Sequence, residues 1–174
     1  MSDQDTAAII RTLNLYALAM DTQRWDMFDQ IFTPDVDADY ADPAHWRDLE
    51  SFRRDFGAYH APFDSTQHVM MNHLVEVSGD EAKSFVYGSW LLIKRGTEGG
   101  DVWQGTGWYD DALVRTDDGW RIRRRACRVV WWGGNPRVNQ TPSDDVSFDT
   151  SSRALRDDAR AGLVGFLGVV RPAK

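Results

Sequence analysis

Four long strand-like segments, one after another, constrain the fold of this chain more than any other feature. They occupy residues 65–77, 82–96, 102–115 and 120–132, and short turns rich in Gly and Asp separate them. Long strands that follow one another across short turns pair as hairpins. The sequence therefore predicts an antiparallel sheet over the second half of the chain.

The first 60 residues follow a helical period instead. Apolar residues recur every three or four positions over residues 5–20 and again over 48–59, which indicates two helices with one apolar face each. A short helix containing Phe28 is expected between them, ending before Pro34. The stretch VDADYA, residues 36–41, alternates as a half-buried strand does. Helices with one strand, followed by hairpins, predict an α+β fold in which a curved sheet wraps around three N-terminal helices.

The end of the chain differs in composition. A polar loop is expected after residue 135, and a last helix near Ser151 that carries Leu155, Leu163, Phe166 and Leu167. We therefore expect one folded domain over 1–135, with 136–174 as a loop and tail helix. The tail is either a lid over a pocket or an oligomer contact, and the sequence favours neither.

Charge and motifs exclude several functions. The net charge of −7 argues against a nucleic-acid partner, and one cysteine among 174 residues excludes an internal disulfide and a cysteine-based zinc site. No phosphate-binding loop, nucleophile elbow or HExxH motif occurs, so we predict no metal and no cofactor. The N-terminus lacks a signal-peptide pattern and the longest apolar run is too short to span a bilayer. A cytoplasmic protein without a membrane partner is expected.

His68 and Asp21 are the first candidates for chemistry. His68 lies in a predicted strand and shares a face with Met70 and Asn72, while His73 falls on the opposite face. An interior histidine with satisfied hydrogen bonds and a general base are both compatible with this position. Asp21 ends the first apolar stripe, so it is either a helix-end cap or a carboxylate that orients a histidine.

Arginines and tyrosines extend the candidate set. In RIRRRACR, alternation places Arg121, Arg123 and Arg125 on a solvated face and Arg128 on the inward face. A buried arginine must be paired or bind a ligand, so Arg128 is expected to pair with Asp21 or to bind an oxygen of a substrate. Tyr16 and Tyr40 also fall on inward faces, as core residues or as hydrogen-bond partners of a substrate.

Four segments together resemble a known family. YALAMDTQRWDMFDQIFTPD, DADYAD, STQHVMMN and GWRIRRRACRVVWW are similar, in order and spacing, to the SnoaL-like branch of the nuclear transport factor 2-like superfamily. That branch includes scytalone dehydratase, bile acid 7α-dehydratase and hexachlorocyclohexane dehydrochlorinase. The resemblance covers roughly residues 5–135. It implies a cone, in which a curved antiparallel sheet surrounds three helices and a pocket opens at one end.

The resemblance also implies roles for single residues. Asp21 and His68 match the Asp–His pair of those lyases, and Tyr40 matches a substrate-binding tyrosine. Further matches around the pocket are Tyr16 and Arg128. Ser89 and Tyr109 are further candidates for binding substrate, since Ser89 stands where the bile acid dehydratase has an Asp and Tyr109 where scytalone dehydratase has an Asn. The second histidine of scytalone dehydratase is not evident here. Four tryptophans are candidates for lining a flat apolar pocket: Trp90, Trp108, Trp131 and Trp132.

The function implied is a cofactor-independent lyase that acts on a hydroxylated aromatic or polycyclic molecule. It would be a dehydratase or a deformylating lyase, for example on lignin-derived diaryl compounds. A ketosteroid-type isomerase or a polyketide cyclase would use the same pair of residues. A non-enzymatic small-ligand binder, or a protein like the β subunits of ring-hydroxylating dioxygenases, is the remaining alternative. A homodimer or homotrimer is expected because an open curved sheet needs its outer face covered.

Overall fold

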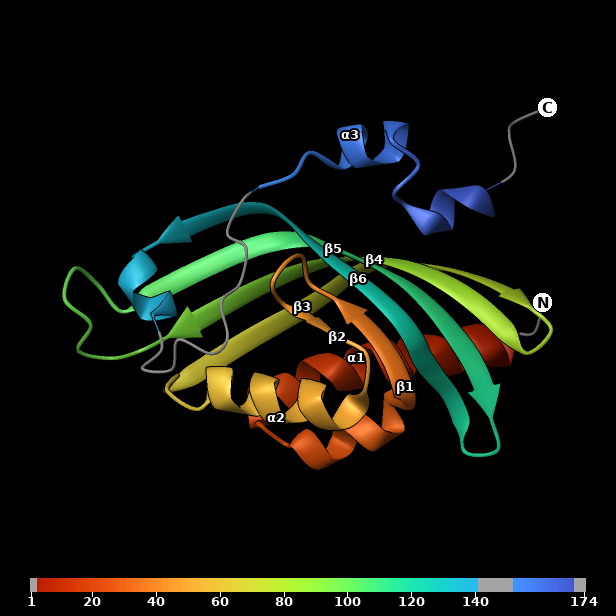
Figure 1. Cartoon of the computed structure of the whole chain (residues 1–174), viewed down its shortest axis with the longest axis horizontal. Coiled ribbons are helices and arrows are strands. Elements are labelled where there is room, and N and C mark those ends of the chain that lie inside the picture. Colours follow the sequence, from red (N-terminus) through yellow and green to blue (C-terminus); the bar gives the residue numbers. More distant parts are fainter. Residues whose placement is uncertain (1–2, 141–151, 171–174) are drawn as a thin grey trace.

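A curved, open sheet of six strands forms the centre of the computed structural model, which describes residues 3–140 and 152–170 (Figure 1). The strand order is β2-β1-β6-β5-β4-β3. The bounds are β1 Phe32–Asp39, β2 His45–Trp46, β3 Ser65–Ser78, β4 Glu81–Ile93, β5 Val102–Thr116 and β6 Gly119–Gly134. The four long strands predicted from the sequence are confirmed. All neighbours are antiparallel except β1 and β6, which run parallel, so the antiparallel prediction is wrong for that one pair.

Three helices cover one face of the sheet, as predicted. They are α1 Asp3–Thr22, the short 3-10 helix η1 Trp25–Gln30, and α2 Leu49–His60 (Figure 1). The carboxylate of Asp48 caps α2 by accepting a hydrogen bond of 2.8 Å from the backbone N–H of Ser51. Apolar side chains of α1 and α2 meet those of the strands in one core, in which Leu13 and Phe52 are fully buried. This core occupies the concave side of the sheet.

Strand β1 begins earlier than the sequence predicts. Pro34 lies inside it, although proline cannot donate a backbone hydrogen bond to a neighbouring strand. The pairing of β1 with β6 is interrupted between Phe32 and Asp37, and Pro34 is exposed there. Pro34 therefore lies in a part of β1 that has no paired residue on β6.

Bulges decide which side chains of β3 and β6 face the helices. In each, two residues of one strand oppose a single residue of its neighbour, which reverses the alternation beyond that point. The bulge in β3 includes Asn72, at a φ of 55°, and it turns His73 to the helix side, where its Nε2 lies 3.0 Å from the side-chain oxygen of Asn14. The two in β6 lie at Arg123 and Val130. Strict alternation therefore predicts the wrong face for His73.

Arg125 is turned into the core by the first bulge of β6. Its side chain is 0% exposed, so its predicted place on a solvated face is wrong. It donates two hydrogen bonds to the carboxylate of Asp111, of 2.9 and 2.7 Å. Its guanidinium also lies 4.3 Å from the ring centroid of Tyr16 and 4.5 Å from that of Tyr109. The bidentate pair and the two aromatic faces offset the cost of burying this charge.

The described part of the tail lies on the other face of the sheet (Figure 1). It forms two short helices, α3 Leu155–Arg160 and η3 Gly165–Gly168. Gly162, whose φ is +71°, lies in the turn between them. The prediction of one continuous tail helix is therefore wrong. The sequence predicts a loop over 135–150, but its start forms another short helix, η2 Pro136–Asn139. The rest of that loop, 141–150, and the helix start at Ser151 lie outside the described residues. The division into 1–135 and 136–174 stays a prediction.

Side chains of the tail pack on the outer face through one small apolar cluster. Val164 and Phe166 contact Phe85 and Trp108, and the carboxylate of Asp110 accepts hydrogen bonds from the backbone N–H groups at the start of η3. Trp108 therefore faces the tail and not a pocket. The described tail residues are not a lid, because they lie on the side of the sheet away from α1 and α2.

Breaking the buried pair at the base of the core should cost much stability. Asp111→Asn leaves the guanidinium of Arg125 uncompensated at 0% exposure, and we expect a loss of about 3–5 kcal/mol in the free energy of unfolding by urea titration. Asp26→Asn, which breaks the exposed pair with Arg24, should change the free energy of unfolding little, because solvent screens that pair. Equal losses in the two variants would contradict this assignment.

Candidate active site

Asp21 and His68 lie in direct contact, at the end of α1 and near the start of β3. The Nδ1 atom of His68 is 2.7 Å from one oxygen of Asp21, and the backbone N–H of His68 donates to the other oxygen at 2.8 Å. The hydroxyl of Thr66 donates to the same carboxylate at 3.0 Å. With Nδ1 bonded to a carboxylate, the neutral ring carries its proton on Nδ1 and leaves Nε2 free as a base. No hydrogen bond to Nε2 occurs among the residues that the structure describes.

The ring of His68 lines a cavity of about 60 Å³ between the helices and the sheet. Aromatic and aliphatic side chains supply most of the wall. The lining residues are Tyr16, Met20, Tyr40, Phe56, Tyr59, His60, His68, Trp90, Leu92, Tyr109, Cys127, Val129 and Trp132. This volume is far below the several hundred Å³ of most ligand pockets, so an aromatic ligand enters only if wall side chains move.

Three tyrosines converge at the inner end of this cavity. The hydroxyls of Tyr16 and Tyr40 form a hydrogen bond of 2.9 Å, and the rings of Tyr16 and Tyr109 pack edge to face with centroids 5.7 Å apart. Burial raises the pKa of Tyr16 to about 12 despite the nearby charge of Arg125, and raises the pKa values of Tyr40 and Tyr109 well above 10. All three phenols therefore stay protonated at neutral pH and can donate hydrogen bonds.

Strand register places two tryptophans beside His68. One row of paired residues runs across four strands, from His68 through Trp90 and Gly105 to Trp132. A Cβ atom on Gly105 would lie 2.4 Å from the ring of Trp132 and 2.6 Å from Nε1 of Trp90. Gly105 thus leaves room for both indoles. Trp90 and Trp132 line the cavity, as predicted, while Trp131 lies on the outer face and is half exposed.

His60 is a second histidine in the cavity wall, and the sequence interpretation missed it. It ends α2, four residues after Phe56, and its Nδ1 donates a hydrogen bond of 2.8 Å to the carbonyl oxygen of Phe56. Its ring lies 6.2 Å from that of His68. Burial, together with the nearby His68, lowers the pKa of His60 to about 3, so it is neutral. Its position one helical turn after Phe56, on the apolar face of α2, was the signal available in the sequence.

Two residues predicted to bind substrate lie outside the cavity. Ser89 directly precedes Trp90 in β4. Because successive side chains of a strand point to opposite faces and Trp90 points into the cavity, Ser89 faces the outer side of the sheet. Arg128 also points outward, because the bulge at Arg123 shifts the alternation and turns Cys127 and Val129 inward instead. The prediction that their side chains lie in the pocket wall is wrong for this reason.

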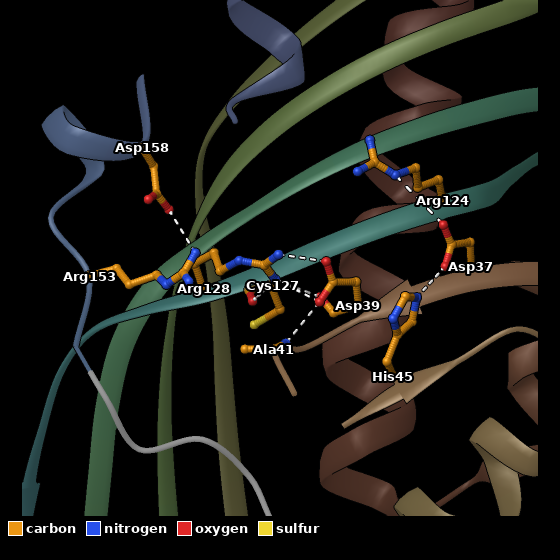
Figure 2. A network of polar contacts seen from close by, with 9 residues as sticks. All are labelled: Asp37, Asp39, Ala41, His45, Arg124, Cys127, Arg128, Arg153 and Asp158. Carbon is orange, nitrogen blue, oxygen red and sulfur yellow. Dashed lines mark hydrogen bonds and ion pairs between the residues drawn. The ribbon is translucent and has the colours of Figure 1, made fainter. Parts of the chain in front are cut away.

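The outer face beside β1 carries its own polar network, which holds Arg128 (Figure 2). The carboxylate of Asp39 accepts two hydrogen bonds from Arg128, of 3.0 and 2.6 Å, so Arg128 pairs with Asp39 and not with Asp21. Burial opposes ionisation of Asp39, but the bonds from Arg128 and from Ala41 N–H prevail and lower its pKa. His45 contacts Asp37 in the same network, at 2.5 Å. Figure 2 shows that Arg153 of the tail reaches the edge of this network.

Cation-binding groups are not clustered in the part of the chain that the structure describes. Within residues 3–140 and 152–170, no three side chains of His, Cys, Asp or Glu are grouped as metal ligands would be. Cys127 lines the cavity, and burial raises the pKa of its thiol to about 12. The polar groups that the described wall offers for chemistry are therefore two imidazoles, tyrosine hydroxyls and indole N–H groups, with the carboxylate of Asp21 behind His68.

Comparison with known proteins places this site in a family context. The sequence model of the SnoaL-like domain matches residues 3–126. An uncharacterized protein of Mycobacterium tuberculosis, Rv2910c, is 34% identical over 131 residues, which cover 70% of this chain and 82% of that protein. The fold is that of nuclear transport factor 2-like proteins.

Two solved structures show the same fold at low identity. A putative scytalone dehydratase of Novosphingobium aromaticivorans is 19% identical, with a TM-score of 0.69, and the match covers 86% of this chain and 94% of that one. A type 2 hexachlorocyclohexane dehydrochlorinase, LinA, is 18% identical, with a TM-score of 0.65 and coverage of 84% and 97%. Identities this low establish the fold and leave the reaction open.

The buried His60 should make stability depend on pH. Its pKa is lower in the folded chain than in the unfolded one, so the unfolded chain takes up a proton first and stability falls as the pH drops below about 6.5. From this residue we expect a loss of about 2 kcal/mol between about pH 7 and about pH 5. The measurement is the free energy of unfolding by urea at both pH values.

His60→Phe should remove this part of the pH dependence. Tyr59→Phe is the matched control, because it alters a neighbouring ring without removing a group that titrates in this range. It should keep the wild-type loss between the two pH values. An unchanged loss in His60→Phe would contradict the assignment of a buried, neutral imidazole.

Proposed function

Since the chain belongs to the SnoaL-like domain family, we propose that it is a cofactor-independent lyase acting on a small hydroxylated aromatic compound. The observation that carries this proposal is the imidazole of His68, which lines the cavity while Asp21 holds its Nδ1. A lyase of this type needs a positioned base and hydrogen-bond donors for a developing oxyanion. Both are present in the wall of one cavity.

The proposed mechanism is an elimination. Nε2 of His68 removes a proton from a carbon atom activated by a carbonyl or a phenol, and the carboxylate of Asp21 stabilises the imidazolium that forms. Tyr16 and Tyr40 share one hydrogen bond, so one of their two hydroxyls, together with that of Tyr109, can donate to the oxygen on which negative charge develops. The imidazolium then returns the proton to the departing hydroxyl, so that water leaves and a carbon–carbon double bond forms.

Cavity size limits the substrate. A volume of about 60 Å³ favours a single aromatic ring over a polycyclic or diaryl compound. A dehydratase that acts on a one-ring hydroxylated substrate is therefore our first choice, ahead of a deformylating lyase that acts on lignin-derived diaryl compounds. The relatives named above as a dehydratase and a dehydrochlorinase support elimination as the reaction class.

An isomerase or cyclase is the second candidate. The hydroxyls of Tyr16 and Tyr40 are hydrogen-bonded to each other, and the ring centroids of Tyr16 and His68 are 6.3 Å apart. This pair would stabilise an enolate equally well. Contact between Asp21 and His68 at the cavity favours these enzymatic functions over a ligand-binding or assembly role. Product analysis separates the two enzymatic classes, because elimination releases a leaving group and isomerisation releases none.

Self-association is part of the proposal. The outer face of the sheet exposes large apolar side chains, among them Val69, Met71, Leu74 and Trp131, of which Trp131 is 50% exposed. We infer that a second or third copy of the chain covers part of this face. No helix within residues 3–140 or 152–170 has the length and apolar character needed to cross a bilayer. A cytoplasmic location stays a prediction.

Replacing the proposed base should abolish most of the catalysis. In a screen of one-ring hydroxylated aromatic compounds, we expect His68→Gln to lower kcat by about 10²–10⁴-fold relative to wild type. Asp21→Asn should also lower kcat strongly, because the amide can no longer fix the tautomer of His68. Turnover is followed by the ultraviolet absorbance of the new double bond.

His73→Gln is the matched control for these variants. It removes a histidine from the same strand that contacts Asn14 instead of the cavity, and it should leave kcat within about twofold of wild type. Turnover that survives His68→Gln undiminished would refute the mechanism. Loss of turnover in His73→Gln to the same extent would point to a structural effect of both changes.

A further inference from the structure

The cavity wall contains hydrogen-bond donors that the mechanism does not use. The indole N–H groups of Trp90 and Trp132 are buried and have no acceptor among the described residues. Both side chains line the cavity, and Trp90 is 6% exposed. A buried donor without an acceptor is costly, so native structures rarely leave one unless a ligand or water satisfies it.

These two indoles lie in the same row as the proposed base. The pairing register runs from His68 to Trp90, Gly105 and Trp132, and three strand spacings separate the ends of this row, roughly 14 Å. A side chain on Gly105 would displace both indoles, so this glycine keeps them against the sheet. The row therefore presents a base at one end and unsatisfied donors beyond it.

Charge around the cavity favours a neutral ligand group at these donors. Within the described residues, the wall includes no Lys or Arg, and the carboxylate of Asp21 contacts it through His68. The charge of Arg125 lies behind the rings of Tyr16 and Tyr109 and is paired with Asp111. An anionic substituent would enter an apolar wall without a counter-ion, which is costly.

We propose that the indole N–H groups of Trp90 and Trp132 form a subsite for a neutral acceptor oxygen of the ligand. The inference rests on the proposed function, since it concerns the same cavity, and it narrows the substrate class. The substrate is a neutral one-ring compound that carries a carbonyl or ether oxygen remote from the position at which His68 acts.

Binding of paired probes tests this subsite without any turnover. para-Hydroxyacetophenone and para-isopropylphenol have similar shapes, and only the first carries a second acceptor oxygen. At mildly acidic pH, where both phenols are neutral, we expect wild type to bind para-hydroxyacetophenone more tightly, by calorimetry. Trp90→Phe or Trp132→Phe should reduce that preference about threefold to tenfold while changing the affinity for para-isopropylphenol little.

Trp103→Phe is the matched control. The indole N–H of Trp103 is also buried without an acceptor, and its ring stacks on Trp132 with centroids 5.4 Å apart, but its side chain does not line the cavity. This variant should keep the wild-type preference. A preference that persists in Trp90→Phe and Trp132→Phe, or no binding of either probe to wild type, would overturn the proposal. Tighter binding of para-hydroxybenzoate would overturn the choice of a neutral group.

Indole N–H resonances of the wild-type protein give a second readout, which does not depend on how stable the variants are. In wild type labelled with ¹⁵N, the signals of Trp90 and Trp132, assigned with the Phe variants, should shift downfield on addition of para-hydroxyacetophenone and not of para-isopropylphenol. Equal responses to the two probes would contradict the subsite. Unmoved signals would contradict it too, as expected if the ring of Trp132 satisfies the N–H of Trp90; the centroids of these two rings are 5.6 Å apart. These outcomes are independent of whether His68 catalyses an elimination.

Discussion

The carboxylate of Asp21 is the contact on which both the fold and the candidate site depend. It accepts hydrogen bonds from the Thr66 hydroxyl, from the backbone N–H of His68 and from Nδ1 of His68. Asp21 belongs to the last turn of α1, while Thr66 and His68 begin β3, an edge strand of the sheet. The contact that fixes the helix end against this strand therefore also sets the orientation and the tautomer of the imidazole.

Polarity changes along the cavity from its inner end to the row that contains His68. At the inner end, the paired charges of Arg125 and Asp111 lie behind Tyr16 and Tyr109, so a cation contacts the faces of two phenol rings without reaching the cavity. Tyrosine hydroxyls come next, and the indoles of Trp90 and Trp132 follow in the row of His68. The wall thus donates hydrogen bonds at two levels, and the basic Nε2 of His68 lies at the level of the indoles.

Hydrophobic period predicted the helices and the four long strands, because each buries one continuous face. It failed where a strand departs from regular pairing. A bulge depends on the partner strand, so the bulge at Arg123, which exchanges the faces of Arg125 and Arg128, has no signal in a local pattern. Proximity of Asp21 and His68 was expected from the family resemblance, whereas periodicity alone left Asp21 as a helix cap. His60 was overlooked because a histidine at a helix end resembles an ordinary core residue.

The state of the His68 ring tests the central claim most directly. Long-range ¹H–¹⁵N correlation spectra of the protein labelled with [¹⁵N]histidine, recorded where the ring is neutral, distinguish its two nitrogen atoms. The account predicts a proton on Nδ1 and an unprotonated Nε2 for His68 in wild type, and loss of this single tautomer in Asp21→Asn. A wild-type His68 with its proton on Nε2, or one whose spectrum Asp21→Asn leaves unchanged, would contradict the claim that Asp21 prepares His68 as the base.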